Sequence, residues 1–352
     1  IFSYPEFIYE QSKLKTRVVI GGSHGKTTIT SMILHVMNFY EIDVDYMVGA
    51  QLEGFDVMVK LTEENDFIVL EGDEYLSSPI DKRPKFHLYK PNIALISGIS
   101  WDHINVFPTY EIYKKQFEIF VESIVEGGSV TYNLDDIDTK EIVNNTNRSI
   151  RKFDYSMPDF NIRDGVTYLQ TIEGELPLEI FGRHNLSNLM GAKWICQQMG
   201  VDEDDFFQAI SCFKGASNRL EKVYSKNNSF IFKDFAHSPS KVEATVNAIK
   251  DQFDKHKIIA CFELHTFSSL NSNFLNEYKD TLNNADIPIV YFSKKTLESK
   301  KMNNIEFSDI VKAFNNNGLI VFDDSSKFKD YLNSMNFNNS VLLMMSSGNF
   351  GN

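Results

Sequence analysis

The segment Gly21-Gly22-Ser23-His24-Gly25-Lys26-Thr27-Thr28 is the feature that most constrains how this chain of 352 residues can fold. It follows an apolar, β-branched run at Thr16–Gly22 and begins a helical pattern at Thr27–Tyr40. Glycines let backbone N–H groups turn toward phosphate oxygens, a lysine reaches the terminal phosphates, and a threonine hydroxyl can take Mg²⁺. The helix N-terminus adds a partial positive charge. The segment therefore predicts a phosphate-binding loop between a buried strand and a helix.

This loop is shorter than the widespread form, which has a glycine five residues before the second conserved one. The chain has Ile20 at that position instead of glycine. The alternative interpretation is a glycine-rich turn without a ligand.

Two further predicted strands end in polar groups. Asp66–Leu70 is followed by Glu71-Gly72-Asp73-Glu74, and Asn92–Ser97 is followed by Trp101-Asp102-His103. Open α/β sheets bind ligands beyond the carboxyl ends of their strands, and Mg²⁺ prefers hard oxygen ligands. Taken singly, the acids indicate a solvated turn and the histidine a structural residue. Three strands that all end in such groups favour one Mg-nucleotide site.

The segment Gly182-Arg183-His184-Asn185-Leu186-Ser187-Asn188 is a weaker signal. Asparagine side chains offer both the donor and the acceptor that an adenine edge requires. Asparagine also caps helices well, so a simple helix start is the alternative.

Polar groups also follow residue 216. Arg219 could bind phosphate, Asp234 could accept hydrogen bonds from ribose hydroxyls, and His237 stands at the entry to a predicted helix. Surface ion pairing of Arg219 and an N-cap turn at His237-Ser238-Pro239 are the alternatives.

The alternation of apolar β-branched runs with helical periodicity predicts an α/β fold with mostly parallel sheets. The length exceeds the ~250–300 residues at which single cores stop growing, so we expect two domains, residues 1–216 and 217–352. A helix is predicted near Asn273–Asn283 in the second.

Composition narrows the partners. The net charge is −13 without a Lys/Arg block, which argues against nucleic acid. Three cysteines without paired spacing suit a reducing compartment, and no apolar run reaches the ~18 residues of a membrane span. We therefore expect a cytoplasmic protein that acts on small molecules; the oligomeric state stays open.

Together these segments resemble the Mur ligase family, in the same order along the chain. The likeness lies in GGSHGKTT, GRHNLSN, NRLE and KDFAHSPS. The resemblance implies a phosphate-loop ATPase domain, a Rossmann-like C-terminal domain, and a carboxylate–amine ligase that uses ATP and Mg²⁺ through an acyl phosphate. It also implies a preceding UDP-binding domain, which we expect to be absent from these 352 residues, so we expect them to bind Mg-ATP with weak or no ligase activity.

By this resemblance Lys26 would bind the β/γ-phosphates, Thr27 and Glu71 would hold one Mg²⁺, and His103 would help to hold a second. Lys26, Glu71 and His103 are thus the expected catalytic residues. The other residues expected to contact ATP are Gly22, Ser23, His24, Gly25, Thr27, Thr28, His184, Asn185, Asn188, Arg219 and Asp234.

The amino-acid sequence around Glu71 is most similar to that of one branch of the family. This branch joins L-Ala-γ-D-Glu-meso-diaminopimelate to UDP-N-acetylmuramate in cell-wall recycling. Tyr75 and Asp81-Lys82-Arg83 favour that branch over the one that adds L-alanine. The expected substrate-facing residues are His237 and His265. His265 replaces an arginine that is usual in the family, which leaves the amine substrate open.

Further departures are Lys233 for a common Asp and Ser238 for the second His of His-His-Pro. A non-catalytic nucleotide-binding regulator on the same fold remains the alternative of another class. A phosphate-loop kinase would not explain GRHNLSN or KDFAHSPS.

Overall fold

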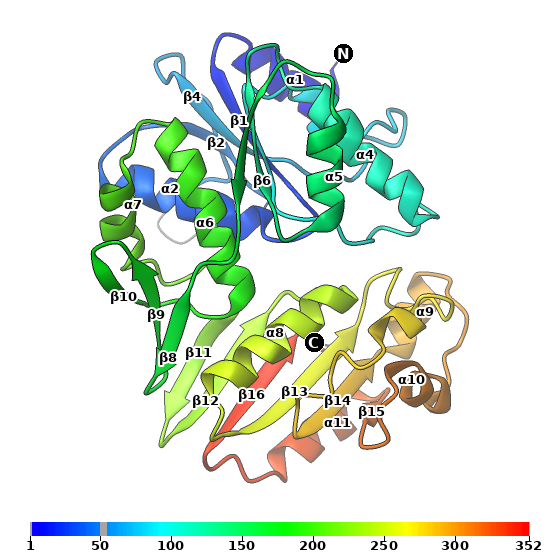
Figure 1. The fold of residues 1–352 in the computed structure, drawn as a ribbon. Helices are drawn as coiled ribbons and strands as arrows, with labels where there is room; N and C mark the ends of the chain where they lie inside the picture. Colours follow the sequence, from blue (N-terminus) through cyan, green and yellow to red (C-terminus); the bar gives the residue numbers. More distant parts are fainter. Residues whose placement is uncertain (1, 50–54, 352) are drawn as a thin grey trace. The chain divides into compact units, whose positions relative to one another are not determined.

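The computed structural model describes residues 2–49 and 55–351. The chain divides into two compact units, Ile1–Ser217 and Asn218–Asn352, each built on its own sheet (Figure 1). Most strand pairs in both large sheets are parallel, so the predicted α/β class is confirmed.

The first unit contains a seven-stranded sheet in the order β3-β2-β4-β1-β5-β6-β7. All neighbouring strands in it are parallel except β2 and β3. The strands are β1 Thr16–Gly21, β2 Asp45–Met47, β3 Val59–Lys60, β4 Phe67–Glu71, β5 Ile93–Ile96, β6 Ser129–Asn133 and β7 Arg151–Tyr155.

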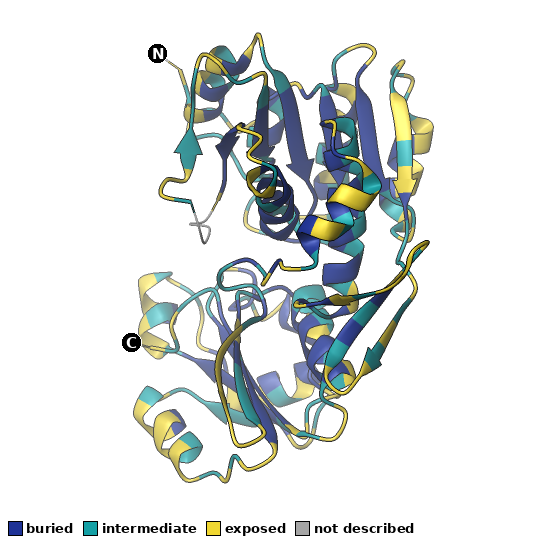
Figure 2. Ribbon diagram, turned by 90° about the vertical axis from the view of Figure 1, so that its left-hand side faces the viewer, coloured by how far each residue is buried: buried dark blue, intermediate teal, exposed yellow. Residues whose placement is uncertain are grey.

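Helices cover both faces of this sheet (Figure 1). They are α1 Tyr4–Ser12, α2 Lys26–Phe39, α3 Lys85–Leu88, α4 Tyr110–Glu122, α5 Ile137–Asn145, α6 Arg183–Gln198 and α7 Glu203–Ile210. Alternation along β1 sets the faces, because Val18 and Ile20 pack with α2, α6 and α7 while Val19 packs with the helices of the other face. The central strands are therefore buried on both sides, as Figure 2 shows.

A small antiparallel sheet follows β7 in the first unit. It consists of β8 Phe160–Arg163, β9 Val166–Thr171 and β10 Gly174–Leu178. It leads directly into α6, which begins at Arg183.

The second unit is a six-stranded sheet in the order β11-β12-β16-β13-β14-β15, antiparallel only between β11 and β12. Its strands are β11 Glu221–Lys226, β12 Ser229–Asp234, β13 Lys257–Leu264, β14 Ile287–Phe292, β15 Ile320–Phe322 and β16 Ser340–Met345. Its helices are α8 Pro239–Gln252, η1 Leu275–Tyr278 (a 3₁₀ turn), α9 Lys294–Ser299, α10 Phe307–Phe314 and α11 Ser325–Asn333. Phe328 of α11 packs with Ile259, Cys261 and Leu342 on one face, and α8 covers the opposite face (Figure 1).

The helix predicted near Asn273–Asn283 is wrong. The chain forms only the 3₁₀ turn Leu275–Tyr278 there, and Asp280 adopts a left-handed φ of 65°. The Asn271 side chain accepts a hydrogen bond from the Asn273 backbone N–H, an alternative to helical bonding that asparagine favours. The side chains of Phe274, Tyr278 and Leu282 are nevertheless buried, although they do not lie on one continuous α-helix.

Within the described residues, none of the helices combines the length and apolar character needed to cross a membrane.

The buried face of α4 gives a test of the first unit. Phe117 is fully buried, whereas Ile119 on the same helix is 41% exposed. Phe117→Ala should lower the free energy of unfolding by about 3–5 kcal/mol because it leaves a cavity, and Ile119→Ala should change it by less than about 0.5 kcal/mol. Trp101 and Trp194 are the two tryptophans of the chain and both lie in this unit, so their fluorescence during urea unfolding reports on it. Equal losses in the two variants would contradict this packing.

Candidate nucleotide-binding site

The strands β4, β1 and β5 are neighbours, and their carboxyl ends meet at one edge of the sheet. Ile20 pairs in register with Glu71, and Gly21 pairs with Ile96. The glycine-rich loop, the acidic segment and the segment before His103 therefore start side by side. The sequence predicted this convergence from the strand ends.

The glycine-rich loop adopts a conformation that its glycines make possible. Gly22 has φ 133°, and a Cβ there would lie 2.0 Å from the Ser97 hydroxyl. Gly25 has φ 76° and stands at the N-cap of α2, so Lys26 is the first residue of that helix. The Ser23 N–H donates to the Gly98 carbonyl (2.9 Å), which ties the loop to the segment that follows β5.

Thr27 and Glu71 lie together beneath this loop. The Thr27 hydroxyl donates to Glu71 Oε1 (2.9 Å), and the Gly49 N–H donates to Glu71 Oε2 (3.0 Å). A hydroxyl beside a carboxylate is the hard-oxygen donor pair that suits Mg²⁺. Across residues 2–49 and 55–351 no group of three or more His, Cys, Asp or Glu side chains could hold a metal ion. Thr27 and Glu71 could hold a Mg²⁺ whose remaining ligands include phosphate oxygens and water, as is common for this ion.

Lys26 is held by a buried acid. Its Nζ donates to Glu74 Oε2 (2.5 Å) and to the Gly22 carbonyl (2.6 Å). The Lys26 side chain is 13% exposed and that of Glu74 is 1% exposed. The sequence marked Glu74 only as a member of the acidic segment and gave it no role.

His103 reaches the same acid. Its Nε2 lies 3.6 Å from Glu74 Oε1, and its ring packs edge-on against Tyr75 with centroids 5.0 Å apart. His103 has a left-handed φ of 54°, an uncommon backbone conformation for a side chain of this size. Lys26, Glu71 and His103, the expected catalytic residues, therefore gather at one place, while the metal-binding roles of Glu71 and His103 stay predictions.

Sequence reasoning missed Tyr113, which completes this site from α4. Its hydroxyl donates to Glu74 Oε1 (3.1 Å) and shares a hydrogen bond with the Ser23 hydroxyl (2.7 Å). The Ser100 N–H in turn donates to Ser23 Oγ (2.9 Å). Tyr113 is fully buried and packs against Phe107 and Phe117, so its surroundings are those of a core aromatic.

Burial and charge pairing compete in this cluster. Burial by itself disfavours the ionised form of Glu74, but Lys26 and His103 outweigh it and lower the pKa of the Glu74 carboxyl. Burial works against the ammonium of Lys26, and the neighbouring carboxylates, first Glu74, raise its pKa despite this. Burial raises the pKa of the Tyr113 phenol far above its usual value. Lys26 is thus a cation and Glu74 an anion at neutral pH.

The helix α6 brings its asparagines to the loop. Asn188 Oδ1 lies 2.2 Å from where a Cβ of Gly25 would stand, so Asn188 packs directly on the phosphate loop. Asn185 is buried and its amide donates to the Phe181 carbonyl (2.9 Å). His184 Nδ1 is buried, and no residue in the described part of the chain hydrogen bonds to it. The three residues lie near the start of α6, and their contact with adenine stays a prediction.

The predicted Arg219 and Asp234 make structural contacts inside the second unit. The Arg219 guanidinium lies 4.6 Å from the centre of the Phe235 ring. Asp234 accepts hydrogen bonds from the N–H groups of Leu220 (2.5 Å) and Ala236 (2.7 Å). Burial raises the pKa of Asp234, against the opposing effects of Arg219 and these hydrogen bonds. Asp234 therefore fixes the turn around Arg219, whatever else it contacts.

His237 and His265 follow β12 and β13 respectively. His237 Nδ1 forms a hydrogen bond with the Phe235 carbonyl (2.9 Å). His265 Nδ1 lies 3.6 Å from the buried carboxylate of Glu263, and its ring leaves so little room that a Cβ on Gly348 would lie 2.6 Å from it. Glu263 also accepts a hydrogen bond from the Phe350 N–H (2.9 Å). Substrate contacts of either histidine stay predictions.

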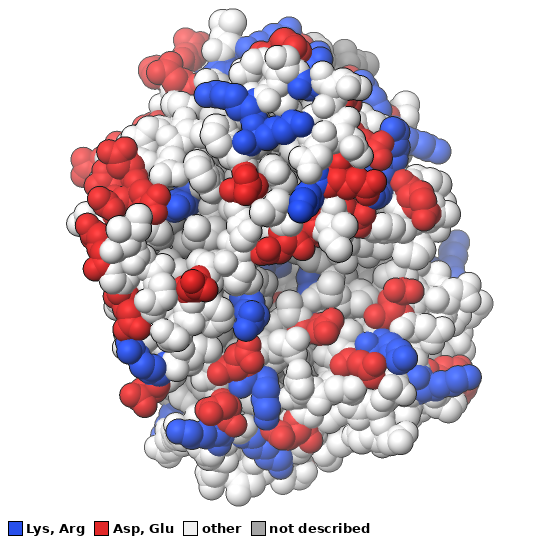
Figure 3. Space-filling model, in the orientation of Figure 1, with Lys and Arg blue, Asp and Glu red and all other residues white. Residues whose placement is uncertain are grey.

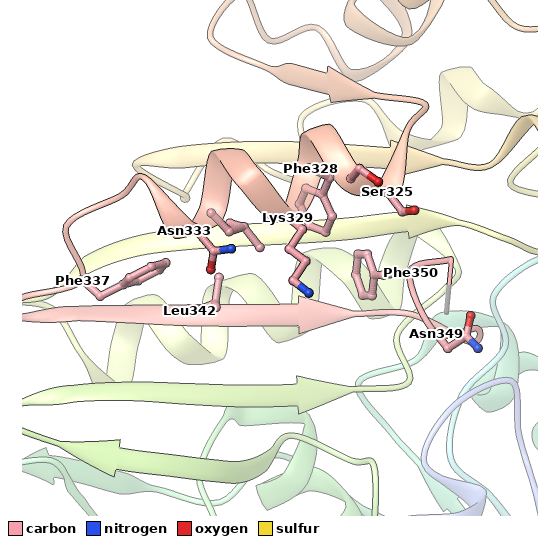
Figure 4. A pocket seen from close by; sticks show the side chains of 10 residues that line it. Ser325, Phe328, Lys329, Asn333, Phe337, Leu342, Asn349 and Phe350 are labelled. Atoms are coloured by element: carbon pink, nitrogen blue, oxygen red, sulfur yellow. The ribbon is translucent and has the colours of Figure 1, made fainter.

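A separate pocket of about 510 Å³ lies in the second unit between α11 and β16 (Figure 4). Its walls combine aromatic side chains such as Phe328, Phe337 and Phe350 with Lys329 and Asn333. It contains no acid and no glycine-rich loop, so it lacks the groups expected for a Mg-nucleotide.

On the face drawn in Figure 3, acidic and basic side chains are interspersed.

The first unit belongs to the phosphate-loop class of α/β proteins. It has a short glycine-rich loop between a buried parallel strand and a helix, and a threonine lies beside an acid at the same sheet edge. The model of the Mur ligase middle domain matches residues 20–196. The chain belongs to the Mur ligase family, whose members are ATP-dependent amide-bond ligases.

Named relatives agree with this assignment. The chain is 32% identical over 306 residues to the UDP-N-acetylmuramate–L-alanine ligase of Caldicellulosiruptor bescii, a match that covers 82% of this chain and 64% of that protein. The relative from Persephonella marina, with the same name, is 29% identical and covers 98% and 75%. The chain thus spans just under two thirds of the first relative.

Solved structures share the fold. A murein peptide ligase from Psychrobacter arcticus superposes with a TM-score of 0.68 at 20% identity, covering 99% of this chain and 78% of that one. The UDP-N-acetylmuramate–alanine ligase from Thermotoga maritima gives a TM-score of 0.72 at 18% identity, covering 99% and 75%. Both confirm the architecture and leave the substrate open.

Gly25 and Gly127 provide a matched pair for testing the loop. Both have a left-handed φ, 76° and 73°, but a Cβ on Gly127 meets nothing within 4 Å. Gly25→Ala should weaken ATP binding by at least about tenfold, because the methyl group displaces Asn188 in addition to the backbone strain. Gly127→Ala carries the strain alone and should leave binding unchanged. Isothermal titration calorimetry measures both, and equal effects would contradict the packing of Asn188 on the loop.

His184 predicts a pH dependence of stability. Burial lowers its pKa from 6.5 to about 4. The unfolded chain takes up this proton near pH 6.5 and the folded chain only near pH 4, so the unfolding free energy should fall as the pH drops through that window. His184→Asn should remove this part of the slope, as measured by urea unfolding at several pH values. Identical slopes in the two proteins would show that His184 titrates normally.

Proposed function

We propose that this protein is an ATP-dependent ligase that joins the carboxylate of UDP-N-acetylmuramate to an amine through an acyl phosphate. The observation that carries the proposal is the gathering of Lys26, Thr27 and Glu71 at one sheet edge around a glycine-rich loop. A phosphate loop alone would fit many nucleotide-binding proteins. Membership in the Mur ligase family supports ligation over hydrolysis or regulation.

The proposed reaction has two in-line steps. A carboxylate oxygen of the muramyl group attacks the γ-phosphorus of ATP, the bond to the β-bridging oxygen breaks, and ADP leaves. The amine then attacks the acyl carbonyl, loses a proton, and inorganic phosphate leaves with the bonding electrons. Mg²⁺, held by Thr27 and Glu71, would neutralise charge on the phosphate oxygens.

The chain's own contribution is position and electrostatics. Lys26 would bind the terminal phosphates at the N-terminus of α2, where backbone N–H groups also point outward. Asn185 and Asn188 of α6 would face the adenine, close to the loop that Asn188 contacts. We further propose residues 1–216 as the ATP-binding domain and residues 217–352 as the C-terminal domain, in which Arg219 and Asp234 contact the nucleotide and His237 and His265 face substrate. The protein would act in the cytoplasm.

Two amines are candidates. Tyr75 and Asp81–Arg83 favour the tripeptide L-Ala-γ-D-Glu-meso-diaminopimelate, and Tyr75 takes part in the site by packing against His103. The name that the relatives share favours L-alanine instead. We keep the tripeptide as the proposed amine, because the residues that distinguish it belong to this chain itself.

The test is ADP formation by the full-length protein with UDP-N-acetylmuramate and either the tripeptide or L-alanine, because the 352 residues alone are expected to bind Mg-ATP with weak or no ligase activity. We expect ADP only when the acid and an amine are both present, with the tripeptide giving the higher kcat/KM. Turnover that does not depend on the amine would favour the non-catalytic or hydrolytic alternative, and a preference for L-alanine would reassign the amine.

Lys26→Met should lower the rate by about 100-fold or more. Lys114→Met removes a lysine that pairs outside the site with Asp138 and Glu141, and it should leave the rate unchanged.

A further inference from the structure

Glu74 is the most thoroughly buried charge of the site, and its two oxygens serve different partners. Oε2 accepts the hydrogen bond from Lys26 (2.5 Å), whereas Oε1 accepts the one from Tyr113 (3.1 Å) and lies 3.6 Å from His103. One carboxylate therefore connects the phosphate loop, α4 and the segment after β5. Neither the family resemblance nor the proposed reaction uses it.

This arrangement conflicts with the work expected of Lys26. The Lys26 ammonium has three hydrogens, and two already point to Glu74 and to the Gly22 carbonyl. A terminal phosphate that approaches Lys26 also approaches the negative charge of Glu74. Because the pair is buried, solvent screens this repulsion poorly.

We propose that Glu74 is a positioning residue that competes with the terminal phosphates for Lys26. In the nucleotide-free protein it holds Lys26 within the loop, and ATP binding takes Lys26 away from it. Its other oxygen stays with Tyr113 and keeps His103 oriented at the sheet edge. This inference rests on the proposed function, since it requires the loop to bind ATP.

Glu74 can release Lys26 without losing all of its partners. Its Oε1 still accepts a hydrogen bond from Tyr113 and lies near His103, and neither contact involves Lys26. Tyr113 is also held by the Ser23 hydroxyl (2.7 Å), and Ser23 by the Ser100 N–H (2.9 Å), and neither bond involves Lys26. A buried carboxylate that loses every partner would be strongly destabilising. The geometry thus fits an acid with one exchangeable and one permanent side.

The test is Glu74→Gln, which removes the negative charge and keeps an oxygen that can accept from Tyr113. We expect the dissociation constants of ATP and ADP, measured by calorimetry in EDTA, to fall about tenfold, which corresponds to ~1.4 kcal/mol. The dissociation constant of adenosine, which has no phosphate, should not change. With substrates and Mg²⁺ present, the KM for ATP and kcat should both fall, because the phosphates bind more readily while His103 loses its orientation.

A merely structural role predicts the opposite pattern, with weaker binding of ATP, ADP and adenosine alike. Asp138→Asn is the matched control, since Asp138 also pairs with a lysine and a tyrosine, Lys114 and Tyr110, but away from the loop. It should leave all three dissociation constants unchanged. Unchanged or weaker ATP binding in a folded Glu74→Gln variant would overturn the inference.

A crystal structure of the wild-type protein with a non-hydrolysable ATP analogue gives a second test that does not depend on the variant. Lys26 Nζ should lie on the terminal phosphates and more than 4 Å from Glu74. Retention of the 2.5 Å pair in the bound state would also overturn the inference. Failure of the wild-type protein to bind ATP would instead count against the proposed function.

Discussion

The parallel order β4-β1-β5 is the constraint on which the rest of the first unit depends. Parallel neighbours have their carboxyl ends at the same edge, so strand pairing alone brings together three segments that are far apart in the sequence. Packing of the buried strands β1 and β5 on both faces of the sheet stabilises this arrangement. Polar side chains then need only follow each strand to reach a common site.

Hydrogen bonds turn this proximity into defined geometry. The loop is tied to the segment after β5 by the Ser23 N–H and the Ser97 hydroxyl, which donates to the His24 carbonyl. Glu71 holds Thr27, while Glu74 holds Lys26. Lys26 and Thr27 are the first two residues of α2, so both acids contact the start of that helix.

The sequence predicted the glycine-rich loop and the polar groups that follow β4 and β5, but it gave no role to Glu74 and missed Tyr113 of α4. A strand with apolar, β-branched residues and a polar end has a strong local pattern, so the positions of Lys26, Glu71 and His103 could be anticipated. Tyr113 has the same spacing as a core aromatic, and only its hydroxyl distinguishes it. The helix expected near Asn273–Asn283 failed for a related reason, since apolar spacing does not reveal how Asn271 and Asp280 direct the backbone.

The acids at the carboxyl ends of parallel strands in this chain differ in the groups that donate hydrogen bonds to them. Asp234 and Glu263 accept hydrogen bonds from backbone N–H groups of Leu220, Ala236 and Phe350, so releasing them would unfold a turn. Glu74 instead accepts hydrogen bonds from the side chains of Lys26 and Tyr113, and side chains can change partner while the backbone stays fixed. Glu71 lies between the two cases, because it accepts from the Thr27 hydroxyl and from the Gly49 backbone N–H. An acid at a strand end can therefore exchange partners most easily when only side chains hold it, as in Glu74. The strand pattern alone does not distinguish the two, because both kinds of acid occupy the same topological position.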